Sequence, residues 1–172
     1  QRCKRVVDAF LNQYRSKPMS TRSISLAELV RATTRLLEFH LRYHLVKLDL
    51  QIEDVAMVLA DPPQIEQLLM NLICNAVQAM QKTTPRLLTV RVAACGEAAL
   101  LEGSDTGCGI PQENLAHLCE RGFTARADGT GHGLGLAISQ GIVHRHGGHM
   151  TVTSQVGQGT TFTVRLPASS VV

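Results

Sequence analysis

Residues 61–81 read DPPQIEQLLMNLICNAVQAMQ, and this segment is the most informative part of the sequence about the fold. Asp61 is a typical helix cap and two prolines suit the first helical turn, so a long helix is predicted from this point. Apolar residues occupy most of its circumference, which indicates packing on more than one side. The polar residues are uncharged amides that fall within roughly 80° of arc at 100° per residue: Gln64, Gln67, Asn71, Asn75 and Gln78.

This amide stripe differs from an ordinary solvent-facing stripe, which carries lysine and glutamate. Amides donate and accept hydrogen bonds but carry no charge. A stripe of this kind on a packed helix predicts a confined polar space, which suits a polyphosphate bound to Mg²⁺ because this ion keeps waters that amides can bind. From the stripe alone, a solvent face that happens to lack charge is an equally good interpretation.

A second polar segment, DTGCGI at residues 105–110, lies between a predicted strand and a predicted helix. Gly107 and Gly109 let the backbone approach a flat ligand closely. The Asp105 carboxylate can accept a hydrogen bond from an exocyclic amine. Taken alone, the pattern is more typical of a tight turn.

A third segment, GTGHGLGL at residues 129–136, places glycines at alternate positions up to the start of a predicted helix. Helix N-termini bind anions through their free N–H groups. The spacing matches neither the P-loop nor the dinucleotide-binding glycine pattern. A plain linker is the alternative, and the immediate entry into a helix weakens it.

The remaining chain interleaves helices with short alternating strands. Ser25-Leu-Ala-Glu predicts a capping box for a helix that runs to about His40. Several strands are joined as hairpins, so the predicted class is α+β, a two-layer α/β sandwich whose mixed sheet packs under helices. Strands are expected at 46–50, at 55–60 with pairing to the first, at 87–93, at 98–104, and as a hairpin of 150–154 and 160–166; helices are also expected at 1–15, 111–120 and 133–146.

Composition excludes several classes of function. The net charge of +3 is dispersed and aromatic residues make up only 3% of the chain, which disfavours a nucleic-acid partner. The five cysteines have no Cys-x-x-Cys spacing, so a disulfide framework or zinc site is disfavoured and a reduced, cytoplasmic location is expected. Because the chain begins at Gln1, we expect it to be part of a longer protein, which could be anchored in a membrane.

Together the three segments resemble the catalytic domain of bacterial sensor histidine kinases, members of the GHKL superfamily with the Bergerat ATP-binding fold. The resemblance covers about residues 20–167, with every motif in order. The matching motifs are the N box at 67–76, the first glycine box at 105–110, the F box at 122–124, the second glycine box at 131–136 and the final Gly-Thr element at 159–162.

The resemblance implies a role for each matching residue. Asn75 would coordinate Mg²⁺, Asp105 would bind the adenine amine, and Thr160 would help through a water. Residues 121–132 would form a lid over ATP. Catalytic positions would be Asn71, Gln67 and Arg126. The nucleotide contacts would be Asn71, Asn75, Gln78, Asp105, Gly107, Gly109, Ile110, Phe123, Gly131, His132, Gly133, Leu134, Gly135, Leu136 and Thr160.

The resemblance also divides the chain. Residues 1–17 would end the second dimerisation helix, 18–24 would be a linker, and 25–172 would be the catalytic ATP-binding domain. Gly103 and Ser104 have low strand propensity, so we expect the strand that leads to Asp105 to be distorted at this edge. None of the seven histidines is followed by an acidic residue, so the phosphoacceptor histidine is expected upstream.

The implied function is transfer of the ATP γ-phosphate to a histidine on the dimerisation domain. The parent would be a homodimer that serves a response regulator receiver domain, and this chain alone a monomer or weak dimer. Asn71 stands where ATP-hydrolysing relatives have a glutamate that activates water, and an amide is a poor general base. Two alternatives stay open: a GHKL enzyme that hydrolyses ATP, and a catalytically silent nucleotide-sensing module.

Overall fold

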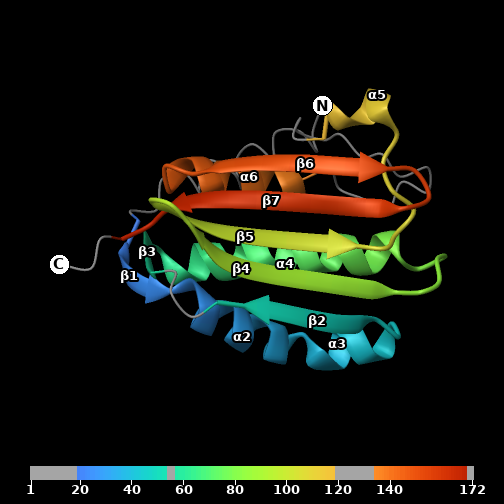
Figure 1. The fold of residues 1–172 in the computed structure, drawn as a ribbon, viewed down its shortest axis with the longest axis horizontal. Helices are drawn as coiled ribbons and strands as arrows, with labels where there is room; N and C mark the ends of the chain where they lie inside the picture. The colour runs from blue at the N-terminus through green and yellow to red at the C-terminus, as the bar shows by residue number, and fades with distance from the viewer. Residues whose placement is uncertain (1–18, 54–56, 119–133, 170–172) are drawn as a thin grey trace, which may run out of the picture.

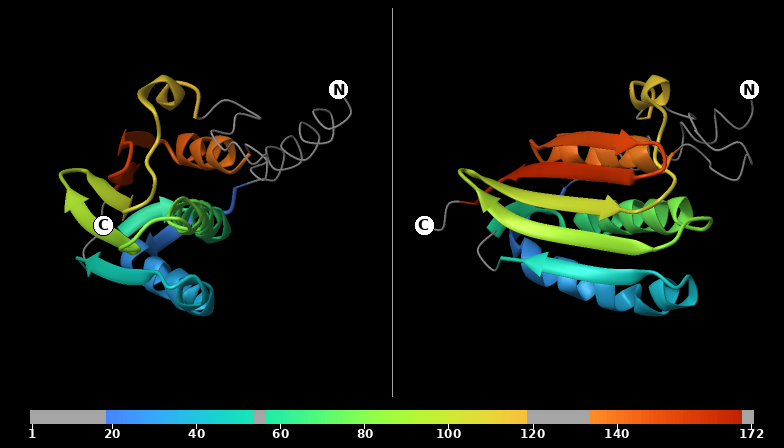
Figure 2. Two further views of the ribbon diagram at one scale, coloured as in Figure 1. Left: turned by 90° about the vertical axis from the view of Figure 1, so that its right-hand side faces the viewer. Right: turned by 45° about the vertical axis from the view of Figure 1, so that its right-hand side comes forward.

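A computed structural model of the chain describes residues 19–53, 57–118 and 134–169. It has two layers, a mixed five-stranded sheet and a layer of helices that covers one face of it (Figures 1 and 2). The predicted α+β sandwich is therefore confirmed. Within the described ranges, no helix combines the length and apolar character needed to cross a membrane.

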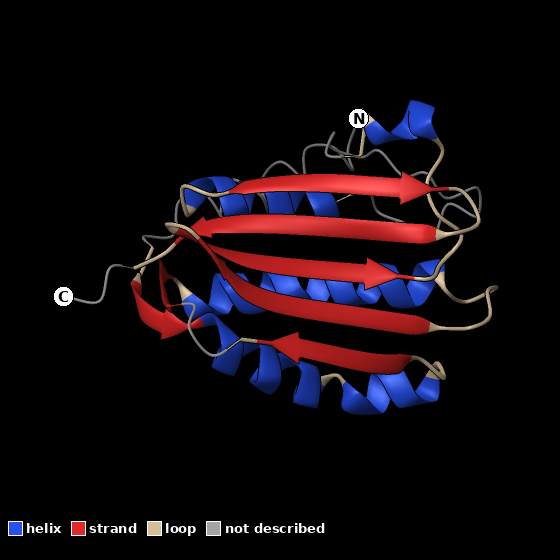
Figure 3. Cartoon of the chain, in the orientation of Figure 1, coloured by secondary structure: helices blue, strands red, loops and turns tan. Residues whose placement is uncertain are grey.

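The main sheet is mixed because one of its strand pairs is parallel. β2 runs parallel to β4, and the three other pairs are antiparallel. The hairpin predicted near the C-terminus is confirmed as β6 and β7. In sheet order the strands are β2 (Lys47–Ile52), β4 (Leu87–Cys95), β5 (Ala98–Asp105), β7 (Gly159–Pro167) and β6 (His149–Gln155) (Figure 3).

The core lies between the sheet and the helices. Alternate side chains of β4 and β7 point inward, among them Val90, Val92 and Val164, which are all but inaccessible to solvent. The intervening positions are polar and more exposed, as in Arg91 and Arg165. An antiparallel sheet with one packed and one solvated face has this alternation.

The helical layer consists of α2 (Leu26–Leu36), α3 (Glu38–Tyr43), α4 (Pro62–Ala79) and α6 (Gly135–Arg145), with the short α5 (Gln112–Leu115) beside them. The Ser25 Oγ accepts a hydrogen bond from the Glu28 N–H at 3.2 Å, which confirms the predicted N-cap. The long helix predicted from Asp61 is α4, and it lies behind β4 and β5, whereas α6 lies behind β6 and β7 (Figure 1).

The predicted pairing of 55–60 with 46–50 is wrong. β3 (Met57–Ala60) pairs instead with β1 (Arg22–Ser25), antiparallel, in a separate two-stranded sheet. The linker expected at 18–24 therefore contributes a strand to the fold. Alternation identifies a strand but not its partner, which tertiary packing selects. Here Val58 and Ala60 are buried, and α4 follows directly.

β5, which the structure describes in full, lacks the distortion expected at Gly103 and Ser104. Gly103 is in register with Val90 on one side and Phe162 on the other. The Ser104 and Thr161 hydroxyls lie 2.9 Å apart and hydrogen-bond across the outer face. The expectation is wrong because β5 is central, so two complete ladders offset the poor strand propensity of these two residues.

Candidate active site

Asp105 is the last residue of β5, and its side chain is buried on the helix-facing side. Its carboxylate accepts the Gly107 N–H at 2.8 Å and a backbone N–H from Thr160. Burial raises the pKa of the Asp105 carboxyl to about 6, against the lowering effect of these two N–H donors. A partly desolvated carboxylate is therefore held at a fixed point between β5 and α4.

Gly107 holds the turn after Asp105 against the end of α4. A Cβ at this position would lie 2.6 Å from the Asp105 Oδ1 and 2.7 Å from the Ala79 Cβ, so a larger residue has no room. The next residue, Cys108, donates its N–H to the Ala79 carbonyl at 3.1 Å. The backbone of the first glycine box is thus joined to the helix of the N box, and its approach to a flat ligand stays a prediction.

Thr160 and Ile110 are brought together by Ser154, a residue that sequence reasoning missed. The Ser154 Oγ accepts the Ile110 N–H at 2.8 Å and shares a 2.9 Å hydrogen bond with the Thr160 hydroxyl. Thr160 is buried, and it pairs with Asp105 in the sheet. Ser154 can be identified as a neighbour of Thr160 only from the register of β6 against β7, and no sequence motif predicts that register.

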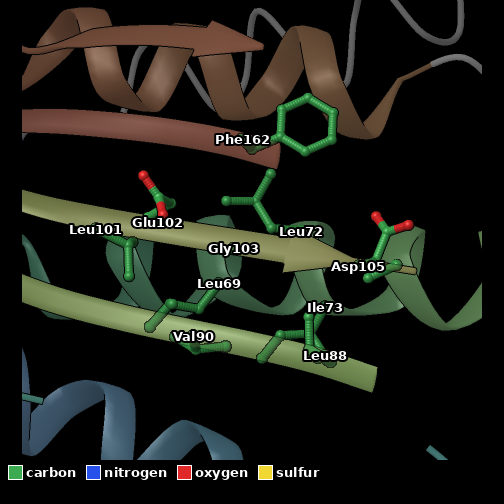
Figure 4. Close-up of a pocket in the computed structure, with 11 residues that line it drawn as sticks. Leu69, Leu72, Ile73, Leu88, Val90, Leu101, Glu102, Gly103, Asp105 and Phe162 are labelled. Carbon is green, nitrogen blue, oxygen red and sulfur yellow. The ribbon is translucent and has the colours of Figure 1, made fainter. Parts of the chain in front are cut away.

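An apolar cavity of about 20 Å³ lies between α4 and the sheet, with Asp105 at one end (Figure 4). Gly103 and Phe162 come to it from adjacent strands, and Asp105 and Glu102 are the ionisable residues that line it. The cavity is too small for a whole base, but the Asp105 carboxylate at its end can accept a hydrogen bond from an exocyclic amine. The other lining residues are Leu69, Leu72, Ile73, Ala76, Leu88, Val90 and Leu101.

On its other side α4 is tied to the first turn of α6. The Asn71 Nδ2 donates to the Gly135 carbonyl at 3.2 Å and lies 3.3 Å from the Ser139 Oγ. Ser139 is completely buried, and it donates to the Gly135 carbonyl at 2.8 Å. Sequence reasoning missed Ser139, whose only signal was its place one helical turn after the last glycine of the second glycine box.

The five amides of α4 do not face one space, so that expectation is wrong at both ends of the helix. Gln64 is buried and donates to the Asp61 Oδ2 at 3.1 Å, near the helix start. Gln78 is exposed. The three middle amides, Gln67, Asn71 and Asn75, are half-buried.

Asn75 is the amide best placed to bind a ligand. Its side chain is half-buried and makes no hydrogen bond within the part of the chain that the structure describes. It precedes Ala76, which lines the cavity, and lies one helical turn before Ala79, which contacts Gly107. A free amide thus lies next to the Asp105 loop.

The far end of α6 is also fixed to α4. His146 is buried, its Nδ1 donates to the Ile142 carbonyl at 2.8 Å, and its Nε2 accepts the Asp61 N–H at 3.0 Å. This pattern requires a neutral ring with its proton on Nδ1. Because both ends of α6 are bonded to α4, the two helices form one platform.

The second glycine box is only partly described. Leu134, Gly135 and Leu136 lie at the start of α6, and Leu136 packs against the core. The other predicted contacts in this region lie outside the described residues: Phe123, Arg126, Gly131, His132 and Gly133. Within the described ranges, no group of three or more histidine, cysteine, aspartate or glutamate side chains could hold a metal ion.

Comparison with known proteins identifies the class. Residues 60–170 match the family described as histidine kinase-, DNA gyrase B- and HSP90-like ATPase. The circadian input-output histidine kinase CikA of Synechococcus elongatus is 36% identical over 162 residues, which cover 90% of this chain and 21% of CikA. The sensor histidine kinase ZraS of Escherichia coli K12 is 31% identical over 169 residues, which cover 98% of this chain and 36% of ZraS.

A solved structure agrees with these relatives. The nucleotide-free catalytic domain of the histidine kinase ThkA matches with a TM-score of 0.77 at 26% identity, over 87% of this chain and 97% of that domain. The chain therefore belongs to the histidine kinase-, DNA gyrase B- and HSP90-like ATPase family. Within this family it is homologous to the catalytic ATP-binding domains of sensor histidine kinases, and it spans 21–36% of the length of the two curated relatives.

Proposed function

We propose that this domain binds Mg–ATP and transfers its γ-phosphate to a histidine outside these 172 residues. The observation that carries the proposal is the buried Asp105 carboxylate at one end of an apolar cavity, beside the half-buried Asn75 of α4. The carboxylate suits the exocyclic amine of adenine, the apolar residues around it suit the ring, and the Asn75 amide suits the metal-bound phosphates. Membership of an ATPase family with sensor kinase relatives supports this assignment.

Adenine is the base that Asp105 favours. An ionised carboxylate only accepts hydrogen bonds, and adenine presents an exocyclic amine where guanine presents a carbonyl oxygen. The N–H groups of Gly107 and Thr160 hold the carboxylate in place before any nucleotide arrives. Binding therefore requires little rearrangement on this side of the site.

The donor set around Asn75 fits Mg²⁺. This ion prefers oxygen ligands, keeps several waters and is commonly held by one or two protein groups plus substrate phosphates. An amide oxygen of Asn75 supplies one such ligand, and no cluster of acidic residues is needed. Bound Mg²⁺ would neutralise charge that develops on the phosphate oxygens. The half-buried Gln67 lies on the same stretch of α4, where it can bind metal-held water.

Asn71 favours transfer over hydrolysis. Its amide nitrogen is engaged by the Gly135 carbonyl and the Ser139 hydroxyl, so this side chain positions the start of α6. An amide cannot take a proton from water at neutral pH. With no base at this position, attack by an acceptor histidine competes favourably with attack by water. A new N–P bond then forms while the bond between the γ-phosphorus and the ADP oxygen breaks.

The acceptor would lie on a dimerisation domain that precedes the catalytic domain in the parent protein. None of the seven histidines of this chain has the acidic successor expected of an acceptor. His146 is unsuited because both of its ring nitrogens are hydrogen-bonded. We further propose a homodimeric parent, a cytoplasmic location for this domain, and a response regulator receiver domain as the final recipient of the phosphate.

Addition of ATP labelled in the γ-phosphate tests this function. The label is followed on this chain alone and on the parent protein extended upstream through the dimerisation domain. We expect label on the extended protein only, stable to base and labile to acid, as for phosphohistidine. An extended protein with the upstream acceptor histidine changed to glutamine is the control, and it should stay unlabelled.

Two other outcomes would each favour a different function. Rapid release of inorganic phosphate by this chain alone would favour a GHKL hydrolase. Binding of ATP with neither release nor labelling would favour a nucleotide-sensing module. Asn71 argues against a hydrolase. The complete set of sequence motifs, together with membership of the family, argues against a silent sensing module.

A further inference from the structure

The inner face of β5 has one position without a side chain. Leu101, Gly103 and Asp105 alternate on the face turned toward α4, so Gly103 lies between a core leucine and the candidate adenine-binding carboxylate. Figure 4 shows this row, with side chains at Leu101 and Asp105 and only backbone at Gly103. The gap lies inside the site.

No residue that the structure describes fills the space that Gly103 leaves. A Cβ added at this position would have no described atom within 4 Å, whereas one added at Gly107 would collide with Asp105 and Ala79. Phe162, the cross-strand neighbour of Gly103, lines the cavity without covering this point. Gly107 therefore provides close backbone contact, and Gly103 provides empty volume.

The size and lining of the cavity limit what can enter it. Its volume of about 20 Å³ is enough for a group the size of one water or methyl. A buried water needs two to four polar partners, and most of the lining residues here are aliphatic or aromatic. The space therefore suits a small apolar group, which is driven into it by the hydrophobic effect.

We propose that Gly103 opens a subsite for a small apolar substituent on the edge of the purine that faces Asp105, so that the domain accepts N6-methylated adenine nucleotides. The inference rests on the proposed binding of adenine at Asp105. A methylated amine keeps one N–H for the carboxylate, and its methyl group can enter the space beside Gly103. Burial of one methyl corresponds to about a fourfold gain in affinity, which offsets the loss of the second N–H.

Titration calorimetry with Mg–ATP and Mg–N6-methyl-ATP tests the subsite. The readout is the ratio of the Kd of N6-methyl-ATP to that of ATP, measured for the wild-type chain, Gly103→Ala and Gly103→Val. We expect a ratio of about one or lower in the wild type and at least about tenfold higher in Gly103→Val, because its two methyls fill the space. Gly103→Ala should be intermediate, and it keeps the test valid if the valine variant fails to fold.

Ser104→Ala is the matched control. Ser104 is on the outer face of the same strand, and its substitution should leave the wild-type ratio unchanged. Two results would overturn the subsite while leaving the proposed function intact. One is a wild-type chain that binds N6-methyl-ATP about tenfold more weakly than ATP, and the other is a Kd ratio that is the same in the wild type and both Gly103 variants. Binding of neither nucleotide to the wild type would contradict the function and the subsite together.

Discussion

The two sides of α4 are built in different ways. The side that faces the sheet meets β4, β5 and β7 through buried aliphatic residues, and Asp105 lies there among backbone N–H donors. The side that faces α6 is joined to it by a few side-chain hydrogen bonds, from Asn71 in the middle of α4 and to Asp61 at its start. We propose that the first side binds the base and the second the phosphates.

One helix thus contributes to two parts of the proposed site that are held by different kinds of contact. Backbone ladders on both sides of β5 hold the main chain at Asp105, and the Gly107 N–H holds its carboxylate. In contrast, the start of α6 is bonded to α4 through the side chains of Asn71 and Ser139. Substitutions on the sheet side of α4 should therefore affect recognition of the base, and substitutions on the α6 side should affect binding of the phosphates.

The largest effect is expected from Asn75→Ala on the phosphate side. Loss of this amide should weaken Mg–ATP binding by at least about 100-fold and remove the benefit of Mg²⁺, because one ligand of the metal is gone. Calorimetry with and without Mg²⁺ measures both effects, and circular dichroism confirms the fold. Gln81→Ala, an exposed amide just beyond α4, is the control. Micromolar Mg–ATP binding by Asn75→Ala would break the division between the two sides.

A smaller effect is expected from pH on the base side. The pKa of Asp105 is raised to about 6 by burial, so its ionised, accepting form is lost as the pH falls through this value. From pH 7 to pH 5, affinity for ATP should fall about tenfold through this group. Because ATP itself titrates in this range, the profile is compared with that of Asp105→Asn. An identical pH profile in the variant would exclude Asp105 as the cause.

Ser139→Ala tests the link between α4 and α6. The change removes the buried hydroxyl that accepts a hydrogen bond from Asn71 of α4 and donates one to Gly135 within α6, and it should lower the free energy of unfolding by about 1 kcal/mol. Urea denaturation measures it, with the exposed neighbour Gln140→Ala expected to change stability by less than about 0.5 kcal/mol. Equal stability of Ser139→Ala and the wild type would mean that this hydrogen-bond cluster does not hold the helices together.

The smallest effect is expected from Gly103→Ala. Unlike Ser139→Ala, this change should stabilise the fold. The added methyl meets open space and reduces the freedom of the unfolded chain, so the free energy of unfolding should rise by about 0.4–1 kcal/mol. Thermal and urea unfolding both report this change. Destabilisation would show that the sheet side of α4 has no spare volume, contrary to the cavity described above.

The sequence was sufficient for features that depend on local pattern. The cap and prolines at Asp61 located the start of α4, and alternation located β4, β5 and the final hairpin. It could not supply features that depend on register or on partners far away in the chain. The pairing of β1 with β3, the bond from Asp61 to His146, and the place of Ser154 beside Thr160 all join residues brought together only by folding.

Gly103 illustrates the same limit within the candidate site. Its low strand propensity predicted distortion, but its position between two complete ladders keeps β5 regular. Its consequence is empty volume next to Asp105, which only the three-dimensional arrangement reveals. Asp105, by contrast, was predicted as a site residue from its motif, and the structure adds its burial and the N–H donor that holds its carboxylate.

The preference for ATP over GTP, compared between the wild type and Asp105→Asn, tests whether Asp105 recognises the base. The Asp105 carboxylate can only accept, so the wild type should bind Mg–ATP at least about tenfold more tightly than Mg–GTP. The asparagine amide can also donate to the guanine carbonyl, so the preference should collapse in Asp105→Asn while Asp49→Asn, a control on β2, retains it. An unchanged preference for ATP in Asp105→Asn would contradict the assignment of the base to this side of α4.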